Sequence, residues 1–306
     1  MPGRLLVTGG SGFIGGHVLA AAASVGWQAV NADQAEIGHV TGVDFLSLDI
    51  VDEAAVAAAV RDAHPDAVIH CAAIGDVDQS EREPELAWRV NVDGTANVAR
   101  AAARLGARLV FLSTSTVFDG QAGRYREDAP PHPVNVYGRT KTAAEHAVRV
   151  LHPPALVARI SMAYGYPRTG GASFLTRVEQ KLRAGEPTDQ PADEFRTPID
   201  ALTCAEALVE LASMDLGGVL HLGPRERISR CDFAVKVARR LGADPALVRD
   251  SRGGDAAGPA AACPAGGGLP GRAPRPKDVS LNTDRARALL RTPLLDPDAG
   301  LARVMG

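Results

Sequence analysis

The sequence predicts an α/β protein with a doubly wound, parallel central sheet and a smaller C-terminal α/β subdomain. Three observations support this fold class. Short apolar segments alternate with helical ones through the first half, which requires right-handed crossovers and a parallel sheet. The apolar segments are nearly unbroken, as expected for strands covered on both faces. A glycine-rich turn at residues 9–15 joins the first strand to the first helix. The alternation ends after Ser161, where the subdomain is expected to begin.

Local signals place each element of the first half. The expected elements are a strand at Leu5–Val7, a helix at Gly12–Val25, strands at Ala29–Asp33 and Val43–Leu48, a helix at Glu53–Ala63, a strand at Ala67–Cys71, a helix at Pro84–Leu105, a strand at Arg108–Ser113, a helix at Val136–Leu151 and a strand at Leu156–Ile160. Gly26 is a natural stop for the first helix, and Asp52 is a natural start for the second.

Shorter elements are expected in the second half. They are a helix at Phe174–Ala184, extended segments at Phe195–Ile199 and Val219–Leu222, a helix at Ala201–Ser213, a helix between Ser229 and Gly242, and a strand followed by a helix over Asp278–Leu290. We therefore expect a nucleotide-binding domain at residues 1–160, completed by about 195–225. A substrate-binding subdomain is expected at 161–194 and 226–306. Residues 250–276 are rich in Gly, Ala and Pro, which predicts a mobile loop or lid.

Composition excludes several classes of function. The 306 residues carry a formal net charge of -3, with 45% hydrophobic and 23% charged residues, as in a soluble globular enzyme. No nucleic-acid partner and no membrane partner is expected at this charge balance. No apolar stretch is long enough to span a bilayer. The four cysteines lack C-x-x-C spacing, so no metal site is expected and a reducing, cytoplasmic location is predicted.

The glycine-rich turn predicts a dinucleotide site. Residues 9–15 contain the pattern G-x-x-G-x-x-G between a strand and a helix. Glycines let the backbone approach a pyrophosphate, and the helix N-terminus offers free N–H groups to that anion. Asp33 ends the second strand, where a carboxylate can accept hydrogen bonds from ribose hydroxyls and repel an extra phosphate. NAD is therefore favoured as the cofactor, and NADP is the alternative.

Further cofactor contacts are expected at the ends of the following strands. Asp49 and Ile50 suit the adenine edge, although Asp49 could equally serve in helix capping. The residues expected to contact the cofactor are Gly9, Gly12, Phe13, Ile14, Gly15, Asp33, Asp49, Ile50, Ala72, Ala73, Tyr137 and Lys141.

Tyr137 and Lys141 carry the chemistry that the sequence predicts. Four residues apart on one helix, they share a face. A nearby ammonium favours the phenolate, so Lys141 is expected to lower the pKa of Tyr137. A tyrosine tuned in this way can exchange a proton with a substrate oxygen.

These motifs together resemble the extended short-chain dehydrogenase/reductase superfamily, which includes the NAD-dependent epimerases and dehydratases. The resemblance covers nearly the whole chain. Residues 91–95 (Asn-Val-Asp-Gly-Thr) resemble its Asn-x-x-Gly-Thr segment, and residues 113–120 resemble its active-site hydroxyl strand. The resemblance implies a Rossmann domain, Thr114 as the catalytic hydroxyl beside Tyr137 and Lys141, and an ordering or water-relay role for Asn91.

Within the superfamily, the chain is most similar to dTDP-4-dehydrorhamnose reductase-like proteins. The similarity rests on Val117–Gly120, Asn135–Lys141, Arg196–Ile199 and Arg275–Leu281. It implies reduction of a keto group on a nucleotide-activated sugar, with Tyr137 as proton donor. Arginine suits bidentate phosphate contacts, which makes Arg159, Arg196 and Arg275 candidates for the substrate, together with Thr114. Residues 114–118 read Thr-Ser-Thr-Val-Phe, where that family usually carries Thr-Asp-Tyr-Val-Phe.

The sequence alone leaves open two alternative functions and the oligomeric state. An epimerase or isomerase that retains its NAD would use the same motifs. A relative of this reductase is a non-catalytic regulatory subunit of methionine adenosyltransferase, a role that would make the Tyr/Lys pair dispensable. A homodimer is expected by fold-level analogy, through the helices at Pro84–Leu105 and Val136–Leu151.

Overall fold

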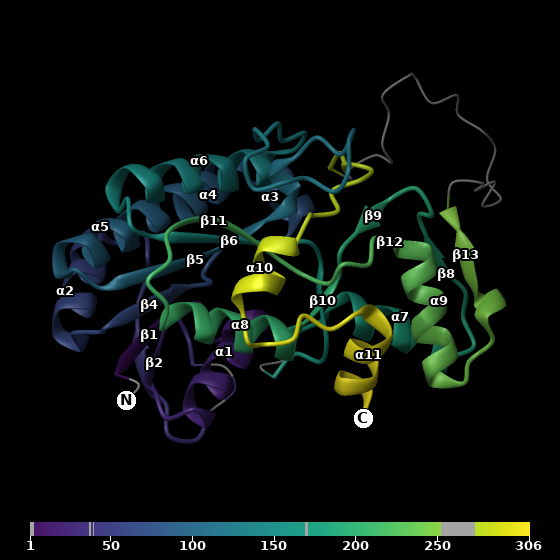
Figure 1. The fold of residues 1–306 in the computed structure, drawn as a ribbon, viewed down its shortest axis with the longest axis horizontal. Coiled ribbons are helices and arrows are strands. Elements are labelled where there is room, and N and C mark those ends of the chain that lie inside the picture. The colour runs from purple at the N-terminus through teal and green to yellow at the C-terminus, as the bar shows by residue number, and fades with distance from the viewer. Residues whose placement is uncertain (1–2, 37, 39, 169–170, 252–272) are drawn as a thin grey trace.

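Seven parallel strands form the central sheet, in the order β11-β6-β5-β4-β1-β2-β3 (Figure 1). The computed structural model describes residues 3–36, 38, 40–168, 171–251 and 273–306. The strands of this sheet are β1 (Arg4–Thr8), β2 (Gln28–Asp33), β3 (Asp44–Ser47), β4 (Ala67–His70), β5 (Arg108–Thr114), β6 (Leu156–Ile160) and β11 (Gly218–Leu222). The predicted parallel α/β class is confirmed.

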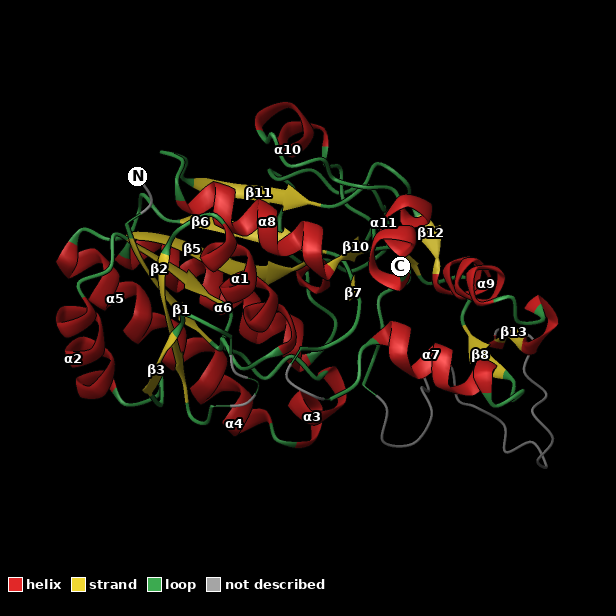
Figure 2. Ribbon diagram, turned by 90° about the horizontal axis from the view of Figure 1, so that it is seen from below, coloured by secondary structure: helices red, strands yellow, loops and turns green. Residues whose placement is uncertain are grey.

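Helices cover both faces of the sheet (Figure 2). On one face, α1 (Phe13–Ser24) and α8 (Ala201–Ala212) pack together over an apolar layer that includes Leu5 and Val7. On the other face, α2 (Glu53–Ala63), α5 (Thr95–Leu105) and α6 (Val136–Leu151) pack against Leu6, Val68 and Leu109. Alternate residues of β1 therefore point into opposite layers.

A smaller lobe lies beyond the carboxyl edge of the sheet. It contains β7 (Ala163–Tyr164), α7 (Phe174–Arg183), β8 (Thr188–Gln190), β9 (Phe195–Arg196), β10 (Ile199–Asp200), β12 (Ile228–Ser229), α9 (Arg230–Leu241), β13 (Val248–Asp250) and α11 (Pro297–Met305). The helix α10 (Asp284–Leu289) packs instead against β11 of the central sheet, where Ala286 joins the apolar layer of α1 and α8 (Figure 1). Its core joins α7, α9 and α11 around Tyr164, Phe174 and Phe233. The predicted domain boundaries stay a prediction, and most of the predicted lid at 250–276 lies outside the described residues.

The helix predicted at Pro84–Leu105 is present and contains a wide turn. It comprises α4 (Pro84–Trp88), a π-helical turn at Arg89–Gly94 and α5, and a further helix, α3 (Val77–Arg82), precedes it. Gly94 stands in the wide turn because a Cβ there would come within 2.7 Å of the Ile50 side chain. The glycine therefore lets α5 approach the end of β3 closely.

Candidate active site

A cleft of about 500 Å³ opens between the carboxyl edge of the sheet and the smaller lobe. Gly12, Gly15 and Ala73 line its nucleotide side, and Thr114, Tyr137 and Lys141 lie in the same cleft. Arginines from the smaller lobe line the rest of it. Among the described residues that line the cleft, five are basic and none is acidic, which favours anionic ligands.

The glycine turn has the geometry of a phosphate cradle. Gly9 has a φ of +72°, and a Cβ on it would lie 2.5 Å from the backbone nitrogen of Ala72. A Cβ on Gly15 would lie 2.0 Å from the Gly9 carbonyl oxygen. No side chain caps the start of α1, where Gly12 is the N-cap. The first-turn N–H groups are thus left for an anion, and Gly9 and Ala72 support the turn from behind.

Asp33 is held against this turn. Its carboxylate accepts hydrogen bonds from the Ser11 backbone N–H (3.0 Å) and from the Gln34 backbone N–H (2.8 Å). Asp49 is exposed and accepts from the Val51 backbone N–H at 2.9 Å, while Ile50 is buried against Gly94. Asp33, Asp49 and Ile50 therefore sit at the ends of β2 and β3, beside the cleft and not among its lining residues.

Burial governs the predicted proton donor and its lysine. The Lys141 ammonium donates to the Leu112 carbonyl at 2.8 Å and lies 4.1 Å from the centroid of the Phe111 ring. Burial lowers the pKa of Lys141 to about 8. Burial also raises the pKa of Tyr137 to about 12, with the Thr114 hydroxyl opposing this rise. The expectation that Lys141 lowers the Tyr137 pKa is wrong for this arrangement, because desolvation of the phenol dominates.

Of the three hydroxyls at the end of β5, Thr114 is the half-exposed one. Its Oγ1 accepts from the Thr116 backbone N–H at 3.1 Å and lies 3.1 Å from the Thr116 hydroxyl. Ser113 is buried and donates to Glu145 at 2.6 Å, and Ser115 is buried in the 3₁₀ turn at 115–117. Thr114 is therefore the hydroxyl placed to meet a substrate oxygen.

Asn91 is fully buried behind the cleft. Its side chain exchanges two hydrogen bonds with the Ile74 backbone, at 2.8 and 3.2 Å, and donates to the Thr140 hydroxyl at 3.0 Å. Thr140 precedes Lys141 on α6. Asn91 thus ties the loop after β4 to the helix that carries the Tyr137–Lys141 pair.

The structure moves one predicted substrate residue away from the cleft. Arg159 is buried, and its guanidinium pairs with the Glu145 carboxylate at 2.6 Å. Its Nε donates to the same carboxylate at 2.8 Å. The two charges therefore pair with each other inside the protein, and the prediction that Arg159 binds substrate is wrong.

The other two predicted substrate residues, Arg196 and Arg275, do line the cleft. Each is held by hydrogen-bond acceptors of the protein. Arg196 donates to Glu194 and to three backbone carbonyls, and burial lowers its pKa to about 10. Arg275 pairs with Asp78 at 2.9 Å. Two further lining arginines, Arg177 and Arg230, were not predicted. A cation in the first turn of α7 opposes the helix dipole, and this anomaly could have drawn attention to Arg177.

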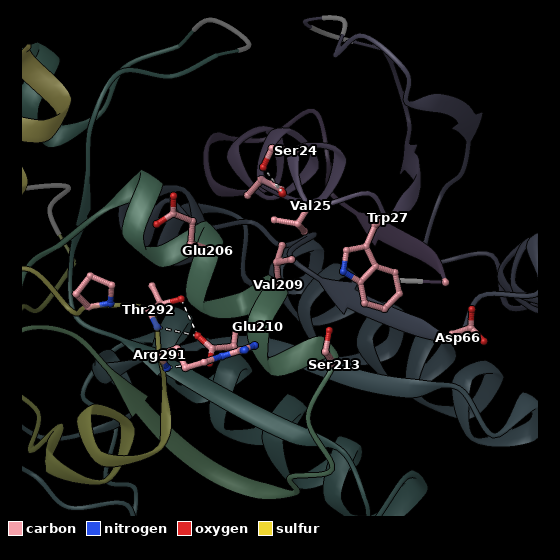
Figure 3. Close-up of a pocket in the computed structure, with 13 residues that line it drawn as sticks. Ser24, Val25, Trp27, Asp66, Glu206, Val209, Glu210, Ser213, Arg291 and Thr292 are labelled. Atoms are coloured by element: carbon pink, nitrogen blue, oxygen red, sulfur yellow. Dashed lines mark hydrogen bonds and ion pairs between the residues drawn. The ribbon is translucent and has the colours of Figure 1, made fainter. Parts of the chain in front are cut away.

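A larger hollow of about 940 Å³ lies at the opposite end of the sheet, between α1 and α8 (Figure 3). Trp27 and Val209 form its apolar wall. Glu210 accepts hydrogen bonds from Thr292 and Arg291, and Glu206 pairs with Arg303. This hollow lies at the amino ends of the strands, far from the tyrosine and lysine, so the smaller cleft is the candidate active site.

The described part of the chain holds neither a metal-binding cluster nor a membrane-spanning helix. No group of three or more His, Cys, Asp or Glu side chains there could hold a metal ion. Within the same residues, no helix combines the length and the apolar character needed to cross a membrane.

Comparisons with known proteins agree with this geometry. Residues 3–305 match the model of the RmlD substrate binding domain. The chain is 37% identical over 259 residues to dTDP-4-dehydrorhamnose reductase of Mycobacterium tuberculosis, covering 80% of this chain and 78% of the relative. It is 33% identical to methionine adenosyltransferase 2 subunit beta of Xenopus laevis, covering 77% and 71%. The solved dTDP-4-dehydrorhamnose reductase of Bacillus anthracis, in complex with NADP, superposes with a TM-score of 0.83 at 26% identity, covering 100% and 99%.

Proposed function

This chain belongs to the RmlD substrate-binding domain family, and on that premise we propose that it reduces a keto group on a nucleotide-activated sugar. It is an oxidoreductase of the extended short-chain dehydrogenase/reductase type that uses a nicotinamide cofactor. The class of substrate follows from the relatives and from the basic lining of the cleft. A 4-keto sugar joined to a nucleoside diphosphate is the substrate that we expect.

One observation carries the proposal: Thr114, Tyr137 and Lys141 share a cleft with the glycine turn. The cofactor supplies the hydride. The substrate carbonyl oxygen gains negative charge as its carbon accepts that hydride, and a positioned phenol can protonate it. With a pKa near 12, Tyr137 is protonated at neutral pH, which is the form that a proton donor needs. Thr114 stabilises the same oxygen by hydrogen bonding, and Lys141 supplies positive charge.

The residues present fit a dinucleotide. A Cβ on Gly9 or Gly15 would clash with neighbouring backbone, so only glycine allows this tight turn, and α1 begins without a side-chain cap, which leaves its N-terminus to a pyrophosphate. Asp33 favours NADH, because its carboxylate would repel the additional phosphate of NADPH. NADPH is the alternative, since a relative was solved with NADP.

Two other roles follow from the same family. An epimerase that retains NAD would use the same three residues. The relationship to a methionine adenosyltransferase subunit raises a non-catalytic role. The presence of Thr114, Tyr137 and Lys141 in one cleft supports an enzyme, because a scaffold has no need of them.

A homodimer through α5 and α6 and a cytoplasmic location are also part of the proposal. The described cysteines Cys71 and Cys204 are free thiols, which fits a reducing compartment. Gel filtration with light scattering would test the dimer.

Absorbance of the reduced nicotinamide tests the activity. We expect a substrate-dependent loss of NADH or NADPH absorbance with a panel of 4-keto nucleotide sugars that includes dTDP-4-dehydrorhamnose. Tyr137→Phe should lose about 10²-fold or more in kcat, because general acid catalysis contributes that much. Turnover without net loss of cofactor, together with NAD that purifies with the protein, would indicate the epimerase. Equal rates for Tyr137→Phe and the wild type would contradict the role of Tyr137.

A further inference from the structure

Arg177 differs from the other basic residues of the cleft in having donors to spare. It stands in the first turn of α7, lines the cleft and is exposed. Its guanidinium donates to the Ala172 carbonyl at 3.3 Å. Within the described chain, no carboxylate pairs with it. A guanidinium carries five N–H donors in a planar fork, so most of this group is available to a ligand.

The other three arginines are fixed by the protein. Arg196 and Arg230 both pair with Glu194, at 3.2 and 3.1 Å. Arg230 also lies over the Phe174 ring, 5.2 Å from its centroid. Arg275 is tied to Asp78. These three side chains give this side of the cleft a fixed positive charge, and Arg177 adds hydrogen-bond donors that can be directed at a ligand.

The position of Arg177 on its helix needs an explanation. A cation in the first turn of a helix is disfavoured by the dipole. The acceptor that the described start of α7 gives to Arg177 is the uncharged Ala172 carbonyl, and a capping box between Ser173 and Thr176 occupies the terminal groups. The capped N-terminus is therefore no anion site in itself. An anion held by the arginine would offset the unfavourable placement of its charge.

We propose that Arg177 binds the diphosphate of the nucleotide-activated substrate, with Arg196 and Arg230 supplying the surrounding positive field. The inference rests on the proposed function and names the anchor for its substrate. The cofactor pyrophosphate is expected at Gly12 and Gly15, on α1, whereas Arg177 lies on α7 in the smaller lobe. A bidentate contact from a guanidinium to phosphate oxygens is the strong geometry for this recognition.

The test measures binding of dTDP, UDP and GDP to the cofactor-loaded protein by isothermal titration, in the wild type, Arg177→Gln and Arg177→Lys. We expect Arg177→Gln to weaken the best of the three about tenfold or more, as loss of a charge-assisted hydrogen bond predicts. The KM for the nucleotide sugar should rise by a similar factor, with kcat and cofactor affinity little changed. Arg177→Lys should recover part of the loss, since it keeps the charge and loses the fork.

Arg183→Gln is the matched control. Arg183 is an exposed arginine on the same helix, paired with Glu179 at 2.7 Å and outside the cleft. It should leave diphosphate binding unchanged. Wild-type affinity in Arg177→Gln would overturn the proposal. So would a loss confined to NADH or NADPH binding, or failure of all three diphosphates to bind the wild type.

The two proposals fail in different ways. Diphosphate binding that depends on Arg177, without reduction of any sugar, would contradict the proposed function and support Arg177 as the diphosphate ligand. Normal turnover and normal KM in Arg177→Gln would sink the anchor and keep the function.

Discussion

At the scale of single residues, spacing along the chain predicts which side chains share a helix face, whereas burial determines their pKa values. Tyr137 and Lys141 lie one turn apart on α6, as their spacing predicts. The spacing also suggested an ammonium that lowers the tyrosine pKa. Instead, desolvation moves the two pKa values in opposite directions, to about 12 for Tyr137 and about 8 for Lys141. Both shifts favour the neutral forms, because both groups are removed from water.

The Lys141 shift predicts a pH profile. A lysine with a lowered pKa loses its charge as the pH rises through that value, so the charged form of Lys141 predominates only below about pH 8. Tyr137 stays protonated throughout this range. If reduction needs the ammonium, kcat/KM for the keto sugar should fall about tenfold per unit above pH 8. Initial rates between pH 6 and pH 10 measure this fall.

Lys141→Arg provides the comparison for that profile. A guanidinium keeps its charge at every pH in the range, so this variant should be slower and flat between pH 7 and pH 10. Circular dichroism checks that it folds. A wild-type profile that stays flat to pH 10 would contradict a catalytic role for the Lys141 charge.

The sequence predicted the catalytic residues better than the substrate-binding residues. Tyr137, Lys141 and Thr114 belong to local motifs, and the structure brings them to one cleft. Arg159 looked like a phosphate ligand, yet its partner Glu145 lies 14 residues earlier on another element. A pattern along the chain does not show such a pairing. Arg177 was missed for the same reason, because only the folded lobe shows which side of α7 meets the cleft.

At the scale of elements, the contact between α6 and the turn at 115–117 positions Tyr137. Gly138 makes this approach close, since a Cβ on it would lie 2.4 Å from the Thr116 carbonyl oxygen and 2.8 Å from Pro133 Cβ. Gly138→Ala should therefore push α6 away, at a cost of about 1–3 kcal/mol in unfolding free energy, as overpacking does. Activity should fall further than stability, because Tyr137 moves relative to Thr114.

Gly75→Ala is the control for this close approach. Its Cβ would meet nothing within 4 Å, and its backbone is outside the left-handed region. Urea unfolding of both variants measures the difference. Equal stability of Gly138→Ala and the wild type would show that α6 can shift without loss.

Elements with strong local signals were predicted closely. Asp52 accepts from the Ala55 backbone N–H and starts α2 at the expected residue, and α6 and β6 also match. The helix predicted at Pro84–Leu105 forms, but the sequence did not predict its π-helical turn at Arg89–Gly94, where tertiary contacts are made. Asn91 bonds to the loop after β4, and Gly94 abuts Ile50. Neither contact has a signature in the local pattern.

At the scale of the whole molecule, a buried ion pair links the helical layer to the sheet. Glu145 on α6 accepts from Arg159 on β6 and from Ser113 on β5. Arg159 lies over the Phe118 ring and 3.4 Å from His221 on β11. Burial lowers the pKa of His221 to about 3, so the ring is neutral and adds no charge beside the guanidinium. The pair thus joins the catalytic helix α6 to three strands of the sheet.

This arrangement predicts a strong dependence on both partners. Their side chains are only 4% and 5% exposed, so removing one leaves a buried charge without its counter-ion. Glu145→Leu or Arg159→Met alone should lower the free energy of unfolding by about 3–5 kcal/mol, whereas the double variant should recover most of that loss. Urea unfolding of the four proteins gives the coupling energy. The Arg183–Glu179 pair, whose arginine is 65% exposed, should couple by only about 0.3–0.5 kcal/mol when it is treated in the same way. Additive losses at Glu145 and Arg159 would contradict the view that each charge is stabilised mainly by the other. They would also reopen a role for Arg159 outside the pair.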